Sequence, residues 1–164
     1  MSKRITLKLM LFLYCSCFAV NITAQGFNED KTAFSNFLHR MYNSAPFEGV
    51  KVVDDYDHKY LISVLSLEKA KYTNQSTIMR VAQVKAQSQA NTFFNGATIS
   101  SDFIICTKGD NQKQSSTLKS VVETIETIKQ NSVGFVNAME LLTSFEIEDG
   151  KGFLFIYFKE LKKE

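Results

Sequence analysis

Ser76-Thr-Ile-Met-Arg-Val-Ala-Gln-Val-Lys-Ala-Gln-Ser-Gln-Ala-Asn-Thr-Phe-Phe94 is the stretch that decides the fold. Its apolar residues recur every three or four positions, which is the spacing of one helix face. The members of this stripe are Ile78, Val81, Ala82, Ala86, Ala90 and Phe93. The three small alanines allow a helix to approach a sheet closely, and Asn95-Gly96 provides a C-terminal stop. The stretch therefore predicts one long helix packed against a sheet.

Two β-like runs precede this helix, at Val50–Val53 and Tyr60–Leu67. The polar stretch Asp54–Lys59 separates them, which is the pattern of a hairpin. Apolar residues occupy both faces of the second run, so it is expected to be an interior strand covered on both sides.

After the helix, an apolar strand is expected at about Ala97 to Cys106, followed by a polar loop at Thr107–Ser116. Leu141–Ile147 and Phe153–Phe158 are predicted to be strands. Asp149-Gly150 lies between them and is a strong hairpin-turn signal. The chain is therefore expected to close with a second hairpin.

Three further segments complete this half of the chain. Leu118–Ile128 has a helical apolar stripe, but its threonines and β-branched residues also suit a long strand, so both assignments stay open. Val133–Val136 is expected to be extended, and Lys159–Glu164 is expected to be a charged tail.

A second amphipathic helix is predicted nearer the N-terminus. Asp30 is its expected N-cap, and Asn43-Ser44 with Pro46 would end it. The apolar face is aromatic-rich and consists of Phe34, Phe37, Leu38, Met41 and Tyr42. Together these elements predict a single α+β domain over residues 25–164. In this fold a small antiparallel sheet packs against the alanine-rich helix, with the N-terminal amphipathic helix added.

Residues 1–24 have the three parts of a secretory signal peptide. Lys3, Arg4 and Lys8 form a basic start, Leu9–Val20 is an apolar run, and the small Ala24 follows. The run is too short for a bilayer core, which takes about 20 apolar residues. We expect cleavage after Ala24, no stable membrane span afterwards, and a periplasmic or secreted location.

Two alternatives to simple cleavage stay open. Cys17 follows the small Ser16 and is a candidate for lipidation, but apolar residues continue beyond it and the upstream pattern is poor. The run could also remain as an uncleaved anchor.

Loss of residues 1–24 changes the charge of the chain. Removing Lys3, Arg4 and Lys8 from the 19 basic residues leaves 16 against 17 acidic residues, a net charge of −1. That balance gives no electrostatic case for nucleic-acid binding. Cys106 is then the only cysteine, so no internal disulfide can form, and its apolar surroundings predict a buried small hydrophobe.

A family resemblance rests on three features between about residues 50 and 158. They are the alanine-studded helix Arg80–Ala90 ending at Asn95-Gly96, the stretch Ser132-Val-Gly134, and the closing hairpin Phe145–Tyr157. The combination resembles the twenty-kilodalton lipoproteins of bacterial envelopes, a family similar to the N-terminal domain of flagellar assembly protein T. The resemblance implies a bacterial envelope protein of structural or interaction type. It supplies no active-site residues, and the chain departs from the family in lacking a convincing lipobox.

Few residues are candidates for chemistry. Asp54-Asp55-Tyr56-Asp57-His58 is the densest group of metal ligands, but it lacks the glycine and the distal glutamate of an EF-hand, and a polar hairpin turn also accounts for it. His39 is expected to be solvated on the polar side of its helix. Glu146 and Glu148 are expected to share the wet face of a strand.

Hydrolase, metalloprotease, redox and phosphate-binding motifs are not found in residues 25–164. The sequence therefore assigns no catalytic, cofactor-binding or metal-binding residue and no cofactor, and it favours a non-enzymatic protein. The expected function is binding, either to an envelope protein partner or by self-association. The alternative is a carrier of a small molecule or lipid, using an apolar cavity between helix and sheet.

We expect the exported chain to begin at Gln25 or a nearby residue, as measured by intact mass and N-terminal sequencing. Ala24→Leu places a bulky residue at the cut, so uncleaved precursor should accumulate. Val20→Ile keeps the apolar run and should be processed normally. A chain that still begins at Met1, or one that begins at a lipid-modified Cys17, would contradict this prediction.

Overall fold

The computed structural model describes residues 29–55, 58–96, 100–107, 114–129 and 132–162. The expected signal peptide, residues 1–24, lies outside the described residues. The chain divides into two compact units, Met1–Phe37 and Leu38–Glu164. No helix among the described residues is long and apolar enough to cross a membrane.

Helix α2 (Glu29–Ser44) confirms the N-terminal amphipathic helix and supplies all that is described of the first unit. It begins one residue before Asp30, so Asp30 lies within the first turn and is not the N-cap. The helix ends at Ser44, whose hydroxyl donates a hydrogen bond to the Arg40 carbonyl at 2.8 Å. The Ala45 backbone N–H continues the helical pattern by donating to the Met41 carbonyl at 2.9 Å.

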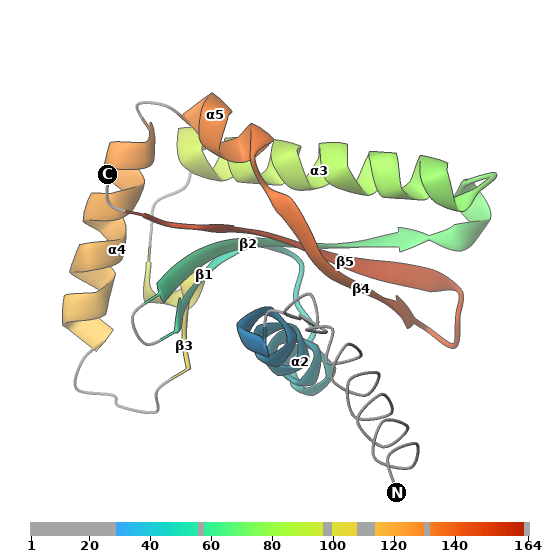
Figure 1. Ribbon diagram of the computed structural model, residues 1–164, viewed down its shortest axis with the longest axis horizontal. Helices are drawn as coiled ribbons and strands as arrows, with labels where there is room; N and C mark the ends of the chain where they lie inside the picture. The colour runs from blue at the N-terminus through green and yellow to red at the C-terminus, as the bar shows by residue number, and fades with distance from the viewer. Residues whose placement is uncertain (1–28, 56–57, 97–99, 108–113, 130–131, 163–164) are drawn as a thin grey trace, which may run out of the picture. The chain divides into compact units, whose positions relative to one another are not determined.

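The second unit is built on a five-stranded sheet with the order β3-β1-β2-β5-β4, which confirms the α+β class (Figure 1). Neighbouring strands are antiparallel except β1 and β3, which are parallel and are separated in the chain by β2 and α3. The strands are β1 (Gly49–Asp55), β2 (His58–Glu68), β3 (Ile104–Cys106), β4 (Glu140–Ile147) and β5 (Gly152–Glu160).

Both predicted hairpins are present. β1 pairs with β2 as far as Asp55 and His58, so most of the polar stretch Asp54–Lys59 belongs to the two strands, and β4 pairs with β5. In the second turn, Glu148, Asp149 and Gly150 all have positive φ, of 53°, 52° and 85°. Gly150 adopts this region without strain, which explains why Asp149-Gly150 is an effective turn signal. β2 is the central strand and is buried on both faces, as predicted.

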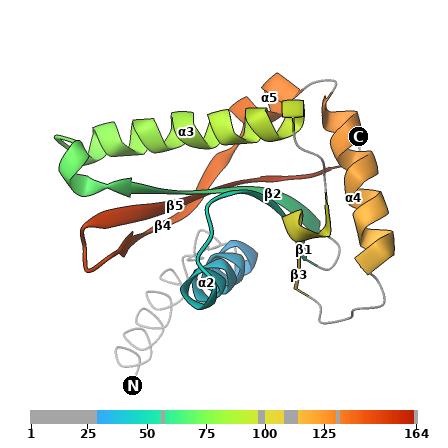
Figure 2. The same cartoon turned by 180° about the vertical axis from the view of Figure 1, so that it is seen from behind.

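Helix α3 (Gln75–Gly96) packs along β2 and also contacts β1 and β5 (Figures 1 and 2). The Asn74 side chain caps its N-terminus by accepting the Thr77 backbone N–H at 2.8 Å. Gly96 is the last helical residue and does not have a positive φ, so it does not form the left-handed cap expected of Asn95-Gly96.

The alanine stripe holds α3 against the centre of the sheet. Ala82, Ala86 and Ala90 are fully buried, and the fully buried Ser63 of β2 lies opposite them. The Ser63 hydroxyl lies 3.3 Å from the Ala86 carbonyl and 2.7 Å from Gln89 Oε1. A helix backbone comes this close to a strand only where its side chains are small, so the stripe sets the distance between the two layers.

The segment after α3 differs from the expectation. Within the described part of the predicted Ala97–Cys106 strand, residues 100–106, Ile104–Cys106 form β3 and follow a 3₁₀ turn at Ser101–Phe103. Residues 97–99 lie outside the described residues. Helix α4 begins at Gln114, so the end of the predicted Thr107–Ser116 loop is helical.

The two remaining segments, Leu118–Ile128 and Val133–Val136, are both helical. Leu118–Ile128 belongs to α4 (Gln114–Lys129), which fully buries Val121 and Ile125 one turn apart. The extended assignment of Val133–Val136 is wrong, because this run forms α5 (Ser132–Asn137) at the end of α3. Val136 is buried there, and the Phe135 ring meets Phe94 at 5.4 Å. Tertiary packing therefore overrides the strand preference of the β-branched residues.

The charged tail is shorter than predicted. Lys159 and Glu160 form the end of β5, and the buried Leu161 donates its backbone N–H to the Lys59 carbonyl at 2.7 Å.

Ala86→Leu should lower the free energy of unfolding by about 1–3 kcal/mol, because it adds bulk where α3 meets β2. Ser88→Leu, on the exposed side of the same helix, should stay within about 0.5 kcal/mol of the parent. Denaturant unfolding followed by circular dichroism measures both. Equal effects at the two positions would show that the stripe does not set the packing distance.

Candidate interaction edge

The two edges of the sheet differ in length and protection. β3 is only three residues long, which is one way in which proteins protect a sheet edge. β4 is eight residues long, contains no proline or lysine, and hydrogen-bonds to β5 along one side. Its protective features are a β-bulge between Leu141 and Thr143 and the exposed carboxylates of Glu140 and Glu146. Among the described strands, β4 is therefore the edge best suited to accept another strand.

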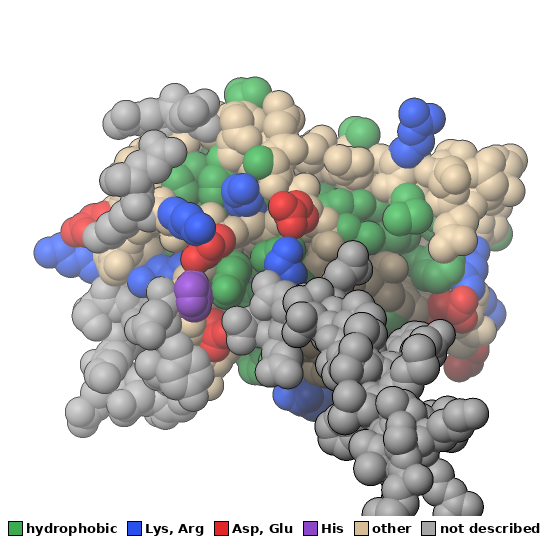
Figure 3. Space-filling model, viewed as in Figure 1, with side chains coloured by type: hydrophobic (Ala, Val, Ile, Leu, Met, Phe, Trp, Pro, Cys, Tyr) green, Lys and Arg blue, Asp and Glu red, His purple; other side chains and the backbone are tan. Residues whose placement is uncertain are grey.

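One face of β4 lies on the same side of the sheet as α3 but extends beyond the helix. Its exposed residues are Leu141, Ser144 and Glu146, which pair with Tyr157, Phe155 and Phe153 of β5. Those β5 residues belong to or pack against the core beneath α3. Figure 3 shows hydrophobic side chains between α3 and the β4–β5 hairpin.

Exposed apolar residues occur both on this face of β4 and on α3. Leu141 is 36% exposed and Met79 of α3 is 41% exposed. Tyr157 connects them, because it pairs with Leu141 and its hydroxyl donates to the Met79 carbonyl at 3.4 Å. Burial raises the pKa of Tyr157 above its ordinary value. We call Met79, Leu141 and the edge of β4 the β4 edge site.

The opposite face of β4 carries Phe145 beneath the C-terminal half of α2. The His39 ring lies 4.1 Å from the Phe145 ring, and Tyr42 meets Phe145 edge-on at 5.9 Å. Partial burial, followed by the carboxylates of Glu48 and Glu148, raises the pKa of Tyr42. These contacts hold β4 from one side and leave its outer edge at the margin of the sheet.

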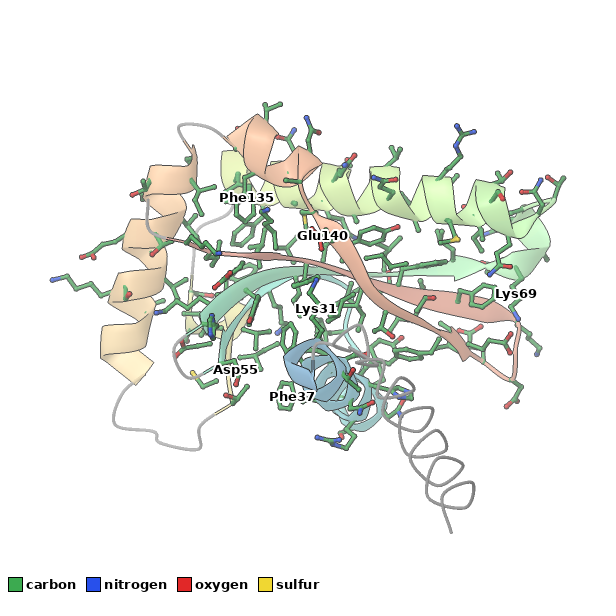
Figure 4. All side chains as sticks on the ribbon, in the orientation of Figure 1. Lys31, Phe37, Asp55, Lys69, Phe135 and Glu140 are labelled. Carbon is green, nitrogen blue, oxygen red and sulfur yellow. The ribbon has the colours of Figure 1, made fainter. Side chains whose placement is uncertain are left out.

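Lys69 fixes the turn end of the hairpin (Figure 4). Its ammonium lies 2.6 Å from Glu146 Oε1 and 4.3 Å from the centre of the Phe153 ring. Its backbone N–H also donates to the Lys151 carbonyl at 2.9 Å. Glu146 is thus engaged in an ion pair, and Glu148 lies in the turn with positive φ instead of sharing the strand face with Glu146 as predicted.

The predicted His58 cluster lies at the other end of the sheet and forms an ion-paired network. His58 Nδ1 is 2.8 Å from Glu160 Oε1, and Lys162 Nζ is 3.2 Å from Glu160 Oε2. The hydrogen bond from His58 and the nearby Lys162 lower the pKa of Glu160. Asp54 lies 3.8 Å from Lys59, and Asp55 accepts a hydrogen bond from Thr107 at 2.8 Å.

Tyr56 and Asp57 lie outside the described residues. No group of three His, Cys, Asp or Glu side chains within the described ranges is arranged to hold a metal ion. The metal hypothesis therefore gains no support from the described part of this loop.

Cys106 is exposed, which corrects the prediction of a buried small hydrophobe. It is the last residue of the short edge strand β3, so its side chain does not reach the core. Partial desolvation and the neighbouring Asp54 raise the pKa of its thiol, which disfavours the reactive thiolate. His39 is exposed, as predicted, although its ring contacts the Phe145 ring at a tilt of 42°.

Sequence reasoning did not identify the β4 edge site. The apolar alternation of Leu141–Ile147 predicts the strand, but strand order decides whether that strand is central or at an edge. Strand order follows from long-range pairing, which no local pattern encodes.

Comparison with known protein families, with curated proteins and with solved structures finds no match for this chain.

Proposed function

We propose that the chain is an exported, non-catalytic protein of the bacterial cell envelope that binds another polypeptide by strand addition at the β4 edge site. The observation that carries the proposal is an eight-residue edge strand that contains the exposed Leu141, together with the exposed Met79 on α3. Strand addition obtains affinity from backbone hydrogen bonds and specificity from alternate side chains. The envelope location rests on the expected signal peptide and on the resemblance to envelope lipoproteins.

The chemistry of the described side chains supports binding over catalysis. His58 is held by Glu160, His39 contacts the Phe145 ring, and the Cys106 thiol has a raised pKa. A nucleophile requires an adjacent base and a group that orients the base. The described contacts of these three residues instead fit structural roles at the surface.

The surface chemistry of β4 restricts the kind of partner. An added strand would place alternate side chains beside Leu141, Ser144 and Glu146, and the others beside Thr143, Phe145 and Ile147. The first set is exposed and the second half-buried. The partner segment should therefore be extended and free of proline, with apolar residues directed toward Phe145 and Ile147.

Leu141→Lys should abolish partner capture or weaken it by roughly tenfold or more, because a charge replaces an exposed apolar contact at the start of β4. Val133→Lys is the matched control, since Val133 is 66% exposed on α5. The tagged chain and both variants are compared for recovery of the same polypeptide from envelope fractions of the source cells, after unfolding midpoints confirm that all three fold.

Equal recovery with Leu141→Lys and the parent would contradict strand addition at β4. If no polypeptide is recovered and native mass spectrometry shows a co-purifying lipid, the carrier hypothesis replaces the present one.

A further inference from the structure

We infer that two copies of this chain pair antiparallel through β4, about a two-fold axis at Phe145, and so join their sheets edge to edge. The inference rests on the same open edge as the proposed function, but it concerns the purified chain alone. Because both proposals use the edge of β4, a second copy of the chain would compete with the partner strand for that edge.

The bulge limits which part of β4 can pair regularly. Leu141 faces the α3 side, whereas Thr143 faces the opposite side, because they pair with Tyr157 and Ile156. From Thr143 to Ile147 the alternation is uninterrupted. A regular ladder on the outer edge is therefore confined to these five residues.

Two-fold symmetry then restricts the register. Residues opposite each other in an antiparallel pair point to the same face of the sheet. From Thr143 to Ile147, odd-numbered residues point to one face and even-numbered residues to the other, so an odd position must pair with an odd position and an even position with an even one. An axis at Phe145 pairs Thr143 with the second copy's Ile147, and Ser144 with its Glu146. This register uses the whole regular segment, whereas an axis at Thr143 or Ser144 would run the bulge into the ladder.

Two registers remain, with the axis at Phe145 or at Glu146, and the charges on β4 favour the axis at Phe145. An axis at Glu146 would place two carboxylates directly opposite each other, which is unfavourable on a strand pair. With the axis at Phe145, each Glu146 faces a Ser144 hydroxyl, which can donate to the carboxylate, and the two Phe145 side chains meet at the centre. β4 is in this sense self-complementary, as an isologous interface requires.

Disulfide trapping tests both the dimer and its register. Ser144→Cys and Glu146→Cys are made separately, each in a Cys106→Ser background, because the native thiol is exposed. Both positions are exposed, so neither change removes core packing. Opposite residues have Cα atoms about 4.5–5.5 Å apart, within disulfide range. Two copies of residue 144 would lie roughly 8 Å apart, which is beyond that range.

We expect a covalent dimer when the two variants are mixed and mildly oxidised, and only monomer when either is oxidised alone. Sedimentation of the parent chain should show a weak, concentration-dependent dimer, because so short an interface is small. Cross-linking of Ser144→Cys alone would overturn the register. A monomer at every concentration, with no cross-link in the mixture, would overturn the dimer while leaving partner capture by Leu141 unaffected.

Discussion

The contact between the alanine stripe of α3 and strand β2 is the constraint on which the rest of the structure depends. Ala82, Ala86 and Ala90 are fully buried, and Ser63 reaches across to the Ala86 carbonyl and Gln89. This close approach places the single long helix over the centre of the sheet, where it covers β2 and reaches β1 and β5. β4 lies one strand further out, so its α3-side residues remain exposed.

The two ends of the sheet are stabilised by different electrostatic contacts. At the β4–β5 turn, Lys69 pairs with Glu146 and lies over the Phe153 ring, which fixes the hairpin that carries the open edge. At the opposite end, His58 and Lys162 hold Glu160. Because its pKa is lowered in the folded chain, Glu160 contributes stability above the ordinary pKa of a glutamate, and this contribution is lost as the pH falls through the lowered value. The pair is partly exposed, so the effect is small.

The elements that the sequence predicts correctly are those with a strong local signal. The stripe from Ile78 to Phe93 specifies α3, and the alternation around Asp149-Gly150 specifies the closing hairpin. α5 is missed because Val133–Val136 has strand propensity but packs at the end of α3. Cys106 is misplaced because β3 is cut to three residues at the margin of the sheet. The β4 edge site depends on strand order, and the chemical candidates at His58 and Glu146 turn out to be ion-paired.

Backbone amide hydrogen exchange of β4, followed by NMR in the dilute chain without a partner, tests the central claim most directly. If β4 pairs on one side only, every second backbone amide from Thr143 to Ile147 points toward β5 and should be protected. The remaining amides of this stretch point away from β5 and should exchange at nearly unprotected rates. β2, at the centre of the same sheet, should be protected throughout. Uniform protection along β4 in the monomeric chain would show that another segment already occupies this edge, and would contradict the account.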